Sequence, residues 1–166
     1  ARIFFVVPKF PQTIQISITN KCNFNCPMCQ RFDLKVNLVD MSFELFTKVI
    51  AQAKGAKDII LTGWGEPLVH PDLVRMVKLC KDNGFNVRFT SNGAMLNSEI
   101  QNKLIEAGLD VITFSIDEIK QSNDSIGHDS TKQLENIKDF KKLIILRNAP
   151  TKIYTQTVIQ KGKNQD

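Results

Sequence analysis

The sequence predicts an α/β fold, a partial (β/α) barrel in which parallel strands alternate with helices over about five βα units. Short runs rich in β-branched residues alternate with longer segments whose apolar residues recur every three or four positions. Glycines or a proline separate most of these segments. Crossovers between parallel strands are almost always right-handed, so successive units curl the sheet toward a barrel. About five units fall short of the eight in a closed barrel.

The first unit begins with a strand over residues 13–19, where isoleucines alternate with polar residues and so share one face. Ser42 is expected to cap the following helix, whose apolar stripe includes Phe46 and Ile50. Gly55 lies just beyond that stripe, where a helix is expected to stop.

The second and third units repeat this order. The second strand is predicted over residues 58–61, and Pro71 is predicted as the first residue of the next helix, which Gly84 ends. The third strand is predicted over residues 86–89 and the third helix over residues 98–107.

The last two units are predicted in the same way. Gly108 is expected to stop the third helix, and the fourth strand follows over residues 111–116. After a polar loop comes a fourth helix, which Pro150 closes before a fifth strand over residues 152–159. The apolar stripe of that helix contains Leu134, Ile137, Phe140 and Ile144.

Composition and charge narrow the class of protein. No apolar run approaches the length of a membrane span, so no membrane association is expected. The formal net charge is +5, but the basic residues are scattered and form no block, so a nucleic-acid partner is not expected. Three of the four cysteines lie close together and no secretory signal precedes them. This pattern indicates metal or redox chemistry in the cytoplasm rather than a disulfide framework.

Polar motifs follow each of the first four predicted strands. The clustered cysteines come after the first strand, residues 63–66 after the second, residues 91–92 after the third, and residues 115–117 at the end of the fourth. In α/β folds of this kind, ligands bind at the carboxyl ends of the strands. We therefore expect all four motifs to lie on one rim and to form one site.

Cys22, Cys26 and Cys29 form a Cys-x3-Cys-x2-Cys motif, which can bend one short loop around a single metal centre. Thiolates select iron–sulfur clusters, zinc or copper(I) over hard cations. Three ligands on a four-iron cluster leave one iron open to a substrate, whereas an electron carrier normally supplies four. The motif thus favours a catalytic iron–sulfur site.

The alternative is a structural zinc site or a set of buried unpaired cysteines. A structural zinc site is expected to have a second Cys-x2-Cys or a pair of histidines at suitable spacing. The other candidate ligands, Cys80, His70 and His128, are isolated from one another in the sequence. Cys80 lies on the apolar stripe of its helix and is expected in the core, and His70 is expected to be a capping or surface residue. From the residues alone, a zinc site stays open.

The cysteine motif after a first strand resembles the signature of the radical S-adenosylmethionine (SAM) superfamily, and the resemblance runs from Thr13 to the end of the chain. It implies a partial barrel of the radical SAM type. It also implies that Cys22, Cys26 and Cys29 bind a [4Fe–4S] cluster, whose unique iron chelates the amino and carboxylate groups of SAM. Met28 occupies a position that is often aromatic in the family and would pack apolar surface against the cofactor.

The segment after the second strand resembles the Gly-Gly-Glu segment of the same family. It consists of Gly63, Trp64, Gly65, Glu66 and Pro67, so that a tryptophan interrupts the usual pair of glycines. The resemblance implies that backbone carbonyls and the carboxylate receive the SAM ammonium. Glycine suits this role because it lets the main chain approach a ligand closely. Taken alone, the segment would also fit a tight turn before a helix.

Three further segments resemble family positions that contact SAM. After the third strand, polar side chains would lie near the SAM carboxylate and ribose, although Asn-Gly alone predicts only a turn. At the end of the fourth strand, side chains would bond the ribose hydroxyls, although an Asp there can also cap a helix. The fifth strand resembles that of the branch that makes the molybdenum cofactor and modifies peptides, and its apolar pair would touch the adenine. The residues concerned are Ser91, Asn92, Ser115, Asp117, Val158 and Ile159.

The function implied by the resemblance is reductive cleavage of SAM to a 5′-deoxyadenosyl radical, which abstracts hydrogen from a peptide or a small biosynthetic intermediate. The implied electron donor is of the flavodoxin or ferredoxin type. Residues 1–166 would form one core domain, with the sixth strand and any carboxy-terminal auxiliary domain outside this sequence. The alternative functions are a non-catalytic domain that binds zinc or an iron–sulfur cluster, and a basic RNA-binding domain.

Overall fold

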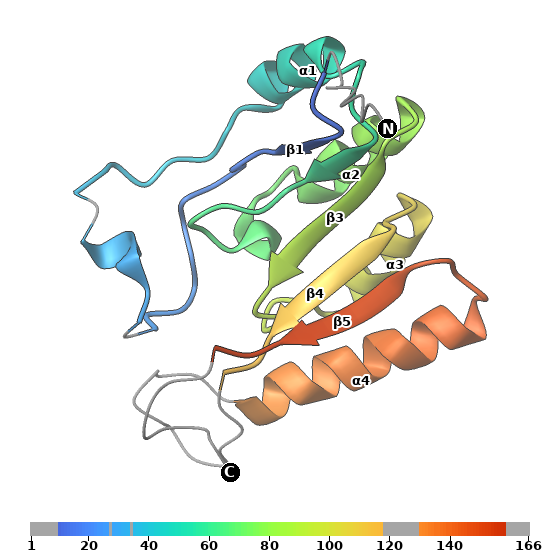
Figure 1. The fold of residues 1–166 in the computed structure, drawn as a ribbon. Helices are drawn as coiled ribbons and strands as arrows, with labels where there is room; N and C mark the ends of the chain where they lie inside the picture. The colour runs from blue at the N-terminus through green and yellow to red at the C-terminus, as the bar shows by residue number, and fades with distance from the viewer. Residues whose placement is uncertain (1–9, 27, 34, 118–129, 159–166) are drawn as a thin grey trace, which may run out of the picture.

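Five parallel strands form a single sheet in the order β1-β2-β3-β4-β5, so each strand pairs with the next one along the chain. The computed structural model describes residues 10–26, 28–33, 35–117 and 130–158. The strands shown in Figure 1 are β1 (Thr13–Gln15), β2 (Asp58–Ile60), β3 (Asn86–Ser91), β4 (Val111–Ser115) and β5 (Lys152–Gln156).

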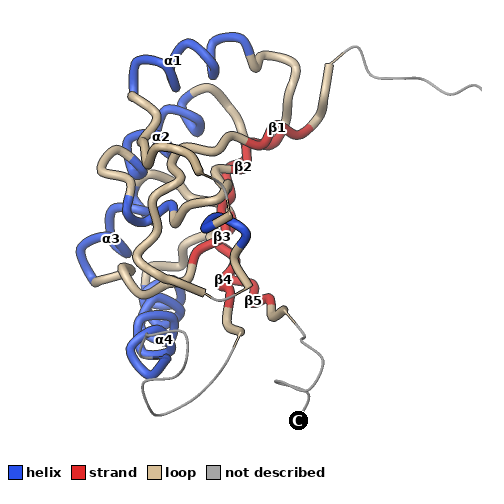
Figure 2. Tube along the Cα trace, turned by 90° about the vertical axis from the view of Figure 1, so that its left-hand side faces the viewer, coloured by secondary structure: helices blue, strands red, loops and turns tan. Residues whose placement is uncertain are grey.

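Helices follow the strands and lie on one face of the sheet, while the other face is open in the part of the chain described (Figure 2). This arrangement confirms the predicted α/β partial barrel of alternating strands and helices. None of the helices described here has both the length and the apolar character needed to cross a membrane. The helices are α1 (Phe43–Gln52), α2 (Leu73–Asp82), α3 (Ser98–Glu106) and α4 (Ser130–Leu146), with short 3-10 helices η1 (Gln30–Phe32) and η2 (Pro67–Val69).

The core lies between the sheet and the helices because every second strand residue points toward them. In β3 and β4, the alternate positions Val87, Phe89, Ile112 and Phe114 are buried. The helices contribute buried apolar residues from one stripe each, including Phe46, Met76, Leu104 and Phe140. Cys80 is fully buried among them, which confirms its expected place in the core.

Several predicted helix ends are confirmed. The side chain of Ser42 accepts a hydrogen bond from the backbone N–H of Leu45, so Ser42 caps α1 as expected. Gly84 and Gly108 follow α2 and α3 with φ of +82° each, a conformation that only glycine adopts without strain.

The predicted start of α2 was wrong. Pro71 is not its first residue, because η2 occupies the chain up to Val69 and a turn then separates it from Leu73, where the helix begins. His70 holds this turn by accepting a hydrogen bond from the backbone N–H of Asp72 at Nδ1. Asp72 is the N-cap residue of α2, so Pro71 lies before the helix and not at its first position.

Two strands, β1 and β5, end three or more residues before their predicted ends. β1 ends at Gln15, although the backbone N–H of Ile16 still donates to the carbonyl of Ile60 at 2.8 Å, and Thr19 then forms an isolated antiparallel bridge with Asp40. β5 ends at Gln156 because the backbone N–H of Val158 bonds the carboxylate of Asp117 instead of continuing the ladder. In both cases the strand stops where the chain turns to build the rim of the sheet.

Candidate functional site

A pocket of about 280 Å³ lies at the carboxyl ends of the strands. The cysteine loop, the segment after β2 and the carboxyl ends of β3, β4 and β5 contribute to it, which fits the expectation that the polar motifs share one rim. Its lining residues are Cys22, Phe24, Cys26, Thr62, Gly63, Gly65, Glu66, Thr90, Ser91, Asn92, Ser115, Asp117 and Gln156.

The cysteine loop brings two of its three thiols to the pocket. Cys22 and Cys26 line it, whereas Cys29 does not. The backbone N–H of Cys29 donates to the carbonyl of Cys26 at 2.9 Å, and the Cys22 sulfur accepts from the backbone N–H of Phe24 at 3.4 Å. Within the described ranges, no three His, Cys, Asp or Glu side chains lie close enough to hold a metal ion together.

Burial raises the pKa of the Cys22 thiol above its ordinary value. Burial also raises the pKa of the Cys26 thiol, to about 11, and the nearby charges of Cys22 and Asp117 act in the same direction. Cys29 opposes ionisation of both thiols as well, so the three cysteines lie within electrostatic reach of one another. The loop thus gathers three soft donors beside the pocket.

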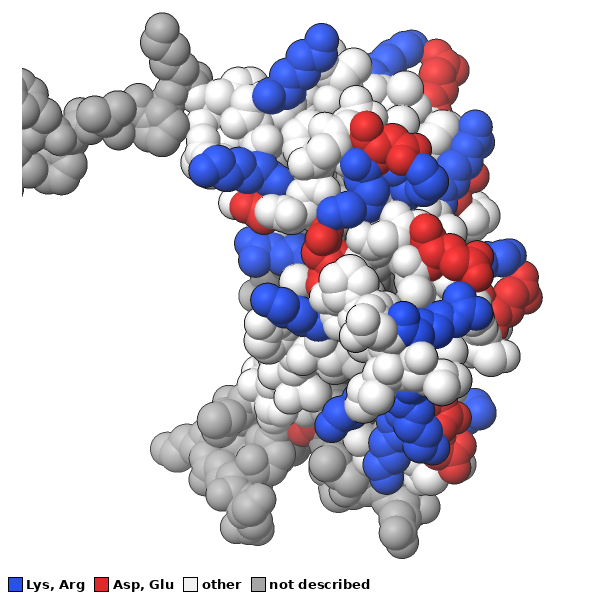
Figure 3. All heavy atoms as spheres, turned by 90° about the vertical axis from the view of Figure 1, so that its right-hand side faces the viewer, with Lys and Arg blue, Asp and Glu red and all other residues white. Residues whose placement is uncertain are grey.

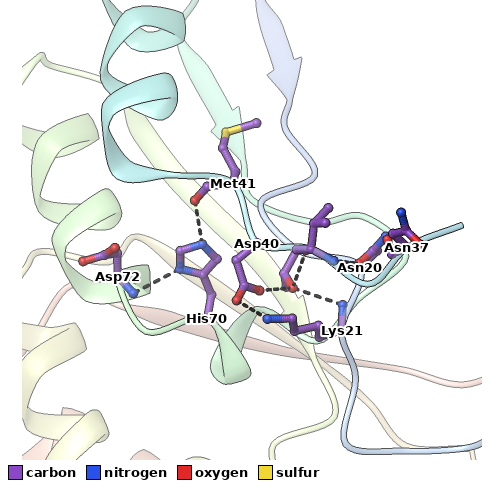
Figure 4. A network of polar contacts seen from close by, with 9 residues as sticks. Asn20, Lys21, Asn37, Asp40, Met41, His70 and Asp72 are labelled. Atoms are coloured by element: carbon purple, nitrogen blue, oxygen red, sulfur yellow. Dashed lines mark hydrogen bonds and ion pairs between the residues drawn. The ribbon is translucent and has the colours of Figure 1, made fainter.

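Hydrogen bonds clamp both ends of the cysteine loop (Figure 4). The carboxylate of Asp40 accepts from the Thr19 hydroxyl at 2.6 Å and from the Lys21 ammonium at 2.7 Å. The side chain of Asn20 donates to the carbonyl of Asn37 at 2.8 Å and accepts from the backbone N–H of Val39 at 2.7 Å. Residues 19–21 and 37–40 are therefore tied together, and the loop between them starts and ends at fixed points.

His70 braces the same region from the opposite side. It lies buried, with Nδ1 accepting from the backbone N–H of Asp72 at 3.0 Å and Nε2 lying 3.0 Å from the carbonyl of Met41. Since Nδ1 accepts, Nε2 bears the proton and donates. His70 thus caps a backbone N–H as expected, but it does so from the interior and not from the surface.

Glu66 joins the end of β2 to the end of β3. One carboxylate oxygen accepts from the Leu68 backbone N–H at 2.9 Å and from the Ser91 hydroxyl at 2.7 Å. The other accepts from the Asn92 backbone N–H at 2.7 Å. Burial raises the pKa of Glu66, while these three donors favour the ionised form. This bracing role was missed by sequence reasoning, which assigned the carboxylate to a ligand.

Gly63 and Gly65 are needed because the chain leaving β1 passes directly over them. A Cβ atom on Gly63 would lie 1.9 Å from the Ser17 hydroxyl oxygen, and one on Gly65 would lie 2.5 Å from the carbonyl oxygens of Thr19 and Lys21. These distances lie far inside van der Waals contact. Glycine thus allows a close approach of the backbone here, and the segment that approaches is residues 17–21 of the same chain.

Asn92 connects the third strand end to the cysteine loop. Its side-chain amide donates to the side-chain carbonyl of Asn23 at 2.9 Å, and its own carbonyl accepts from the backbone N–H of Ala94 at 3.0 Å. Asn136, a buried residue of α4, donates to the carbonyls of Gly93 and Ala94 at 3.1 Å each. A helix far away in sequence thus holds the loop that presents Asn92.

The fourth and fifth strand ends are joined in a similar way. The Asp117 carboxylate accepts from the backbone N–H of Val158 at 2.9 Å, and the backbone N–H of Ile116 donates to the carbonyl of Gln156 at 2.9 Å. Gln133, another buried residue of α4, donates to the carbonyl of Ser115 at 2.8 Å. Ser115 and Asp117 both line the pocket.

Besides Cys29, three described residues that were predicted to contact SAM do not line the pocket. Met28 and Val158 are exposed, and Pro67 is buried at the start of η2. Ile159 lies outside the described residues, as does His128. Conversely, Phe24, Thr62, Thr90 and Gln156 line the pocket without having been assigned to it. Their positions could have been predicted from the sequence, because each residue lies in the cysteine loop or near the carboxyl end of β2, β3 or β5.

Comparisons with known proteins agree with this geometry. A family model described as the radical SAM superfamily matches residues 16–166. Among curated proteins, a tungsten-containing aldehyde ferredoxin oxidoreductase cofactor-modifying protein of Pyrococcus furiosus is 33% identical over 120 residues, which cover 69% of this chain and 34% of that protein. A GTP 3′,8-cyclase of Campylobacter curvus is 34% identical over 163 residues, which cover 92% of this chain and 48% of that protein. This chain thus spans less than half of either relative.

The fold comparison points the same way. Streptococcus suis SuiB bound to precursor peptide SuiA superposes with a TM-score of 0.72 at 17% identity, over 91% of this chain and 34% of that one. At this identity the likeness shows the fold alone. The match of the family model over nearly the whole chain, together with the cysteine loop at the strand ends, establishes that the chain belongs to the radical SAM superfamily.

Proposed function

We propose that this chain is the core domain of a radical SAM enzyme, with SAM bound in the pocket at the strand ends. The observation that supports this most is the convergence of the cysteine loop, the glycine segment after β2 and the polar ends of β3, β4 and β5 on one pocket. Members of the family use a [4Fe–4S] cluster and SAM. Residues 1–166 are proposed to form this domain as one unit.

The residues fit the proposed cluster. Three thiols on one short loop are soft donors of the kind that iron–sulfur clusters require, and three leave one iron open. Cys22, Cys26 and Cys29 would hold the cluster, and its binding would add to the stability of the folded chain, because metal binding is coupled to the folding of its ligands. When bound and reduced, the cluster supplies the electron that cleaves SAM to a 5′-deoxyadenosyl radical, which abstracts hydrogen from the substrate.

The other pocket residues would bind and orient SAM. Backbone carbonyls around Gly63 and Gly65 would receive the ammonium, while Glu66 holds these carbonyls in place through its bonds to the third strand end. Asn92, Ser115 and Asp117 offer the polar groups for the carboxylate and ribose. Met28, Pro67, Val158 and Ile159 are proposed to pack against the cofactor from the rim.

The substrate and the electron donor are proposed from the family. Radical SAM enzymes use a reductant, and we infer a donor of the flavodoxin or ferredoxin type. The substrate is inferred to be a small biosynthetic intermediate or a peptide, as the names of the Campylobacter relative and of SuiB indicate for those proteins. A cytoplasmic location is inferred from the four cysteines, all of which are free thiols.

Anaerobic reconstitution tests the proposal. The chain should incorporate about four irons with matching sulfide, and the electron paramagnetic resonance signal of the reduced cluster should change when SAM is added. The variants C22A, C26A and C29A should each lose iron and sulfide. C80A is the matched control, because it also removes one cysteine but from the core, and it should retain the cluster.

Two outcomes would contradict the proposal. Zinc bound without sulfide would support a non-catalytic metal-binding domain. A cluster whose resonance signal ignores SAM would leave a structural or electron-carrying role.

A further inference from the structure

The open face of the sheet is polar, although both faces of a parallel sheet are usually covered. The residues that alternate with the buried core positions point to this face. In β3 and β5 they include Arg88, Lys152 and Tyr154, all of them exposed. Figure 2 shows α1, α2, α3 and α4 on the opposite face of the sheet. A polar, uncovered face next to a cofactor pocket is suited to holding a substrate.

Strand register places two cations in one row. Arg88 pairs with Val111, and Val111 pairs with Lys152, so the three lie side by side on neighbouring strands. The outer two are separated by two strand spacings, about 10 Å between their backbones. Both line a hollow of about 290 Å³ near the amino-terminal ends of the strands. Val111 between them is short and apolar and leaves this space open.

Within the described residues, neither of these cations takes part in an ion pair, although two carboxylates line the same hollow. Neither Arg88 nor Lys152 has a carboxylate within ion-pair distance in that part of the chain. Of the two acids that line the hollow, Asp110 is engaged by Lys81 at 2.7 Å and by the backbone N–H of Val87 at 2.6 Å. The other, Asp58, accepts a hydrogen bond from the side chain of Asn86 at 3.2 Å. Asp58 and Asn86 are register partners, and they lie one row farther from the cofactor pocket than Arg88 does.

The row of cations lies within a small molecule's reach of the pocket. Arg88 is two residues before Thr90, and Lys152 is four before Gln156, and both of these later residues line the pocket. At about 3.3 Å per residue, the separations along the strands are about 7 and 13 Å. The row between contains Thr113 and its register partner Tyr154. A molecule on this row could touch the pocket at one end and the cations at the other.

We propose that the open face binds the substrate through an anionic group, a carboxylate or a phosphate, held between Arg88 and Lys152. This inference rests on the proposed function for its reaction and adds the substrate class. The arginine guanidinium binds either anion through two parallel hydrogen bonds, and the lysine ammonium adds a point charge. The body of the substrate lies across Thr113 and Tyr154, which places its reacting end at the cofactor pocket.

The single tyrosine provides a local probe, since Tyr154 follows Lys152 on the same face. In reconstituted chain labelled with 3-fluorotyrosine, the one fluorine resonance is followed during titration with sodium phosphate or sodium acetate at constant ionic strength. The resonance should shift and saturate with at least one anion. The anion with the lower apparent dissociation constant identifies the anionic group of the substrate as a phosphate or a carboxylate. In R88Q/K152Q the apparent dissociation constant should rise at least tenfold. K138Q/K141Q removes two positive charges from α4 and should change it less than twofold.

Cluster assays on the same samples separate this inference from the proposed function. R88Q/K152Q should keep the iron content and the response of the reduced cluster to SAM, which also shows that it is folded. Saturation in the wild type with equal affinity in R88Q/K152Q would overturn the anion site, as would the lack of any saturable shift with both anions. If no cluster forms but the anion still binds through the two cations, the proposed function fails and the binding site stands.

Discussion

At the residue scale, some of the side chains that line the pocket also hold the fold together. Glu66 is only 3% exposed, and its carboxylate accepts hydrogen bonds from the Leu68 backbone N–H in η2 and from the Ser91 hydroxyl and Asn92 backbone N–H at the end of β3. The motif predicted that this residue belongs to the site, and it lines the pocket. Two of its three donors, Ser91 and Asn92, were not predictable, because they lie about 25 residues away and only the fold brings them near.

Replacing Glu66 by Gln should destabilise the fold by about 1–3 kcal/mol, because the glutamine NH₂ group would face donors and leave at least one without an acceptor. Chemical denaturation measures this. E44Q is the control, since Glu44 is exposed and lies on the outer surface of α1. An E66Q variant as stable as the wild type would show that the three hydrogen bonds contribute nothing net.

Gly63→Ala should cost about 1–3 kcal/mol, because the new methyl group would overlap the Ser17 side chain, whose oxygen lies 1.9 Å from the added Cβ position. Removing that side chain should relieve most of the overlap. The double variant S17G/G63A is therefore expected to lie close in stability to S17G alone. If the two substitutions instead destabilise additively in denaturation experiments, the close approach of these segments is not the reason for the glycine.

At the element scale, segments distant in the sequence hold the site. Asp40 clamps the start of the cysteine loop to its end, and Gln133 and Asn136 of α4 support the third and fourth strand ends. The apolar stripe predicted α4, but it could not identify the polar residues on its inner side as supports. Periodicity finds which face of a helix is buried, whereas hydrogen-bond partners depend on how the helix is placed.

The clamp at Asp40 should make stability depend on pH. Burial opposes its ionisation, but hydrogen bonds from Lys21 and Thr19 outweigh this and lower its pKa. An acid with a lowered folded pKa stabilises the fold above its unfolded pKa, about 3.9, and loses that contribution as the pH falls through the folded value. The wild type should exceed D40N by about 1 kcal/mol at pH 6, and the gap should close below about pH 4.

Unfolding free energies measured from pH 7 to pH 3 decide this point. K48Q serves as a control for loss of an ordinary exposed ion pair on α1, and its curve should run parallel to that of the wild type. A constant gap between wild type and D40N down to pH 3 would mean that ionisation of Asp40 does not contribute to the clamp.

At the scale of the whole molecule, the order of the elements and the side of the sheet on which the site lies were predictable. Alternating periodicities indicate βα units, and parallel strands bring their carboxyl ends together. The row of Arg88, Val111 and Lys152 on the open face was not predictable, because it depends on the register of three strands. Acidic and basic side chains are mixed on the face shown in Figure 3, in agreement with the scattered charges of the sequence.

The clamped cysteine loop also links the cofactor to the stability of the whole fold. A cluster that binds only the folded chain stabilises it by mass action. Tight thiolate ligation is expected to raise the free energy of unfolding by about 2 kcal/mol or more. For a chain of this size, that corresponds to a rise in melting temperature of about 4–8 °C. Anaerobic calorimetry of the chain before and after reconstitution measures it. The rise should persist in C80A and vanish in C22A, because only Cys22 belongs to the loop. An equal rise in C22A would mean that iron and sulfide bind elsewhere on the molecule, and the loop would lose its assigned role.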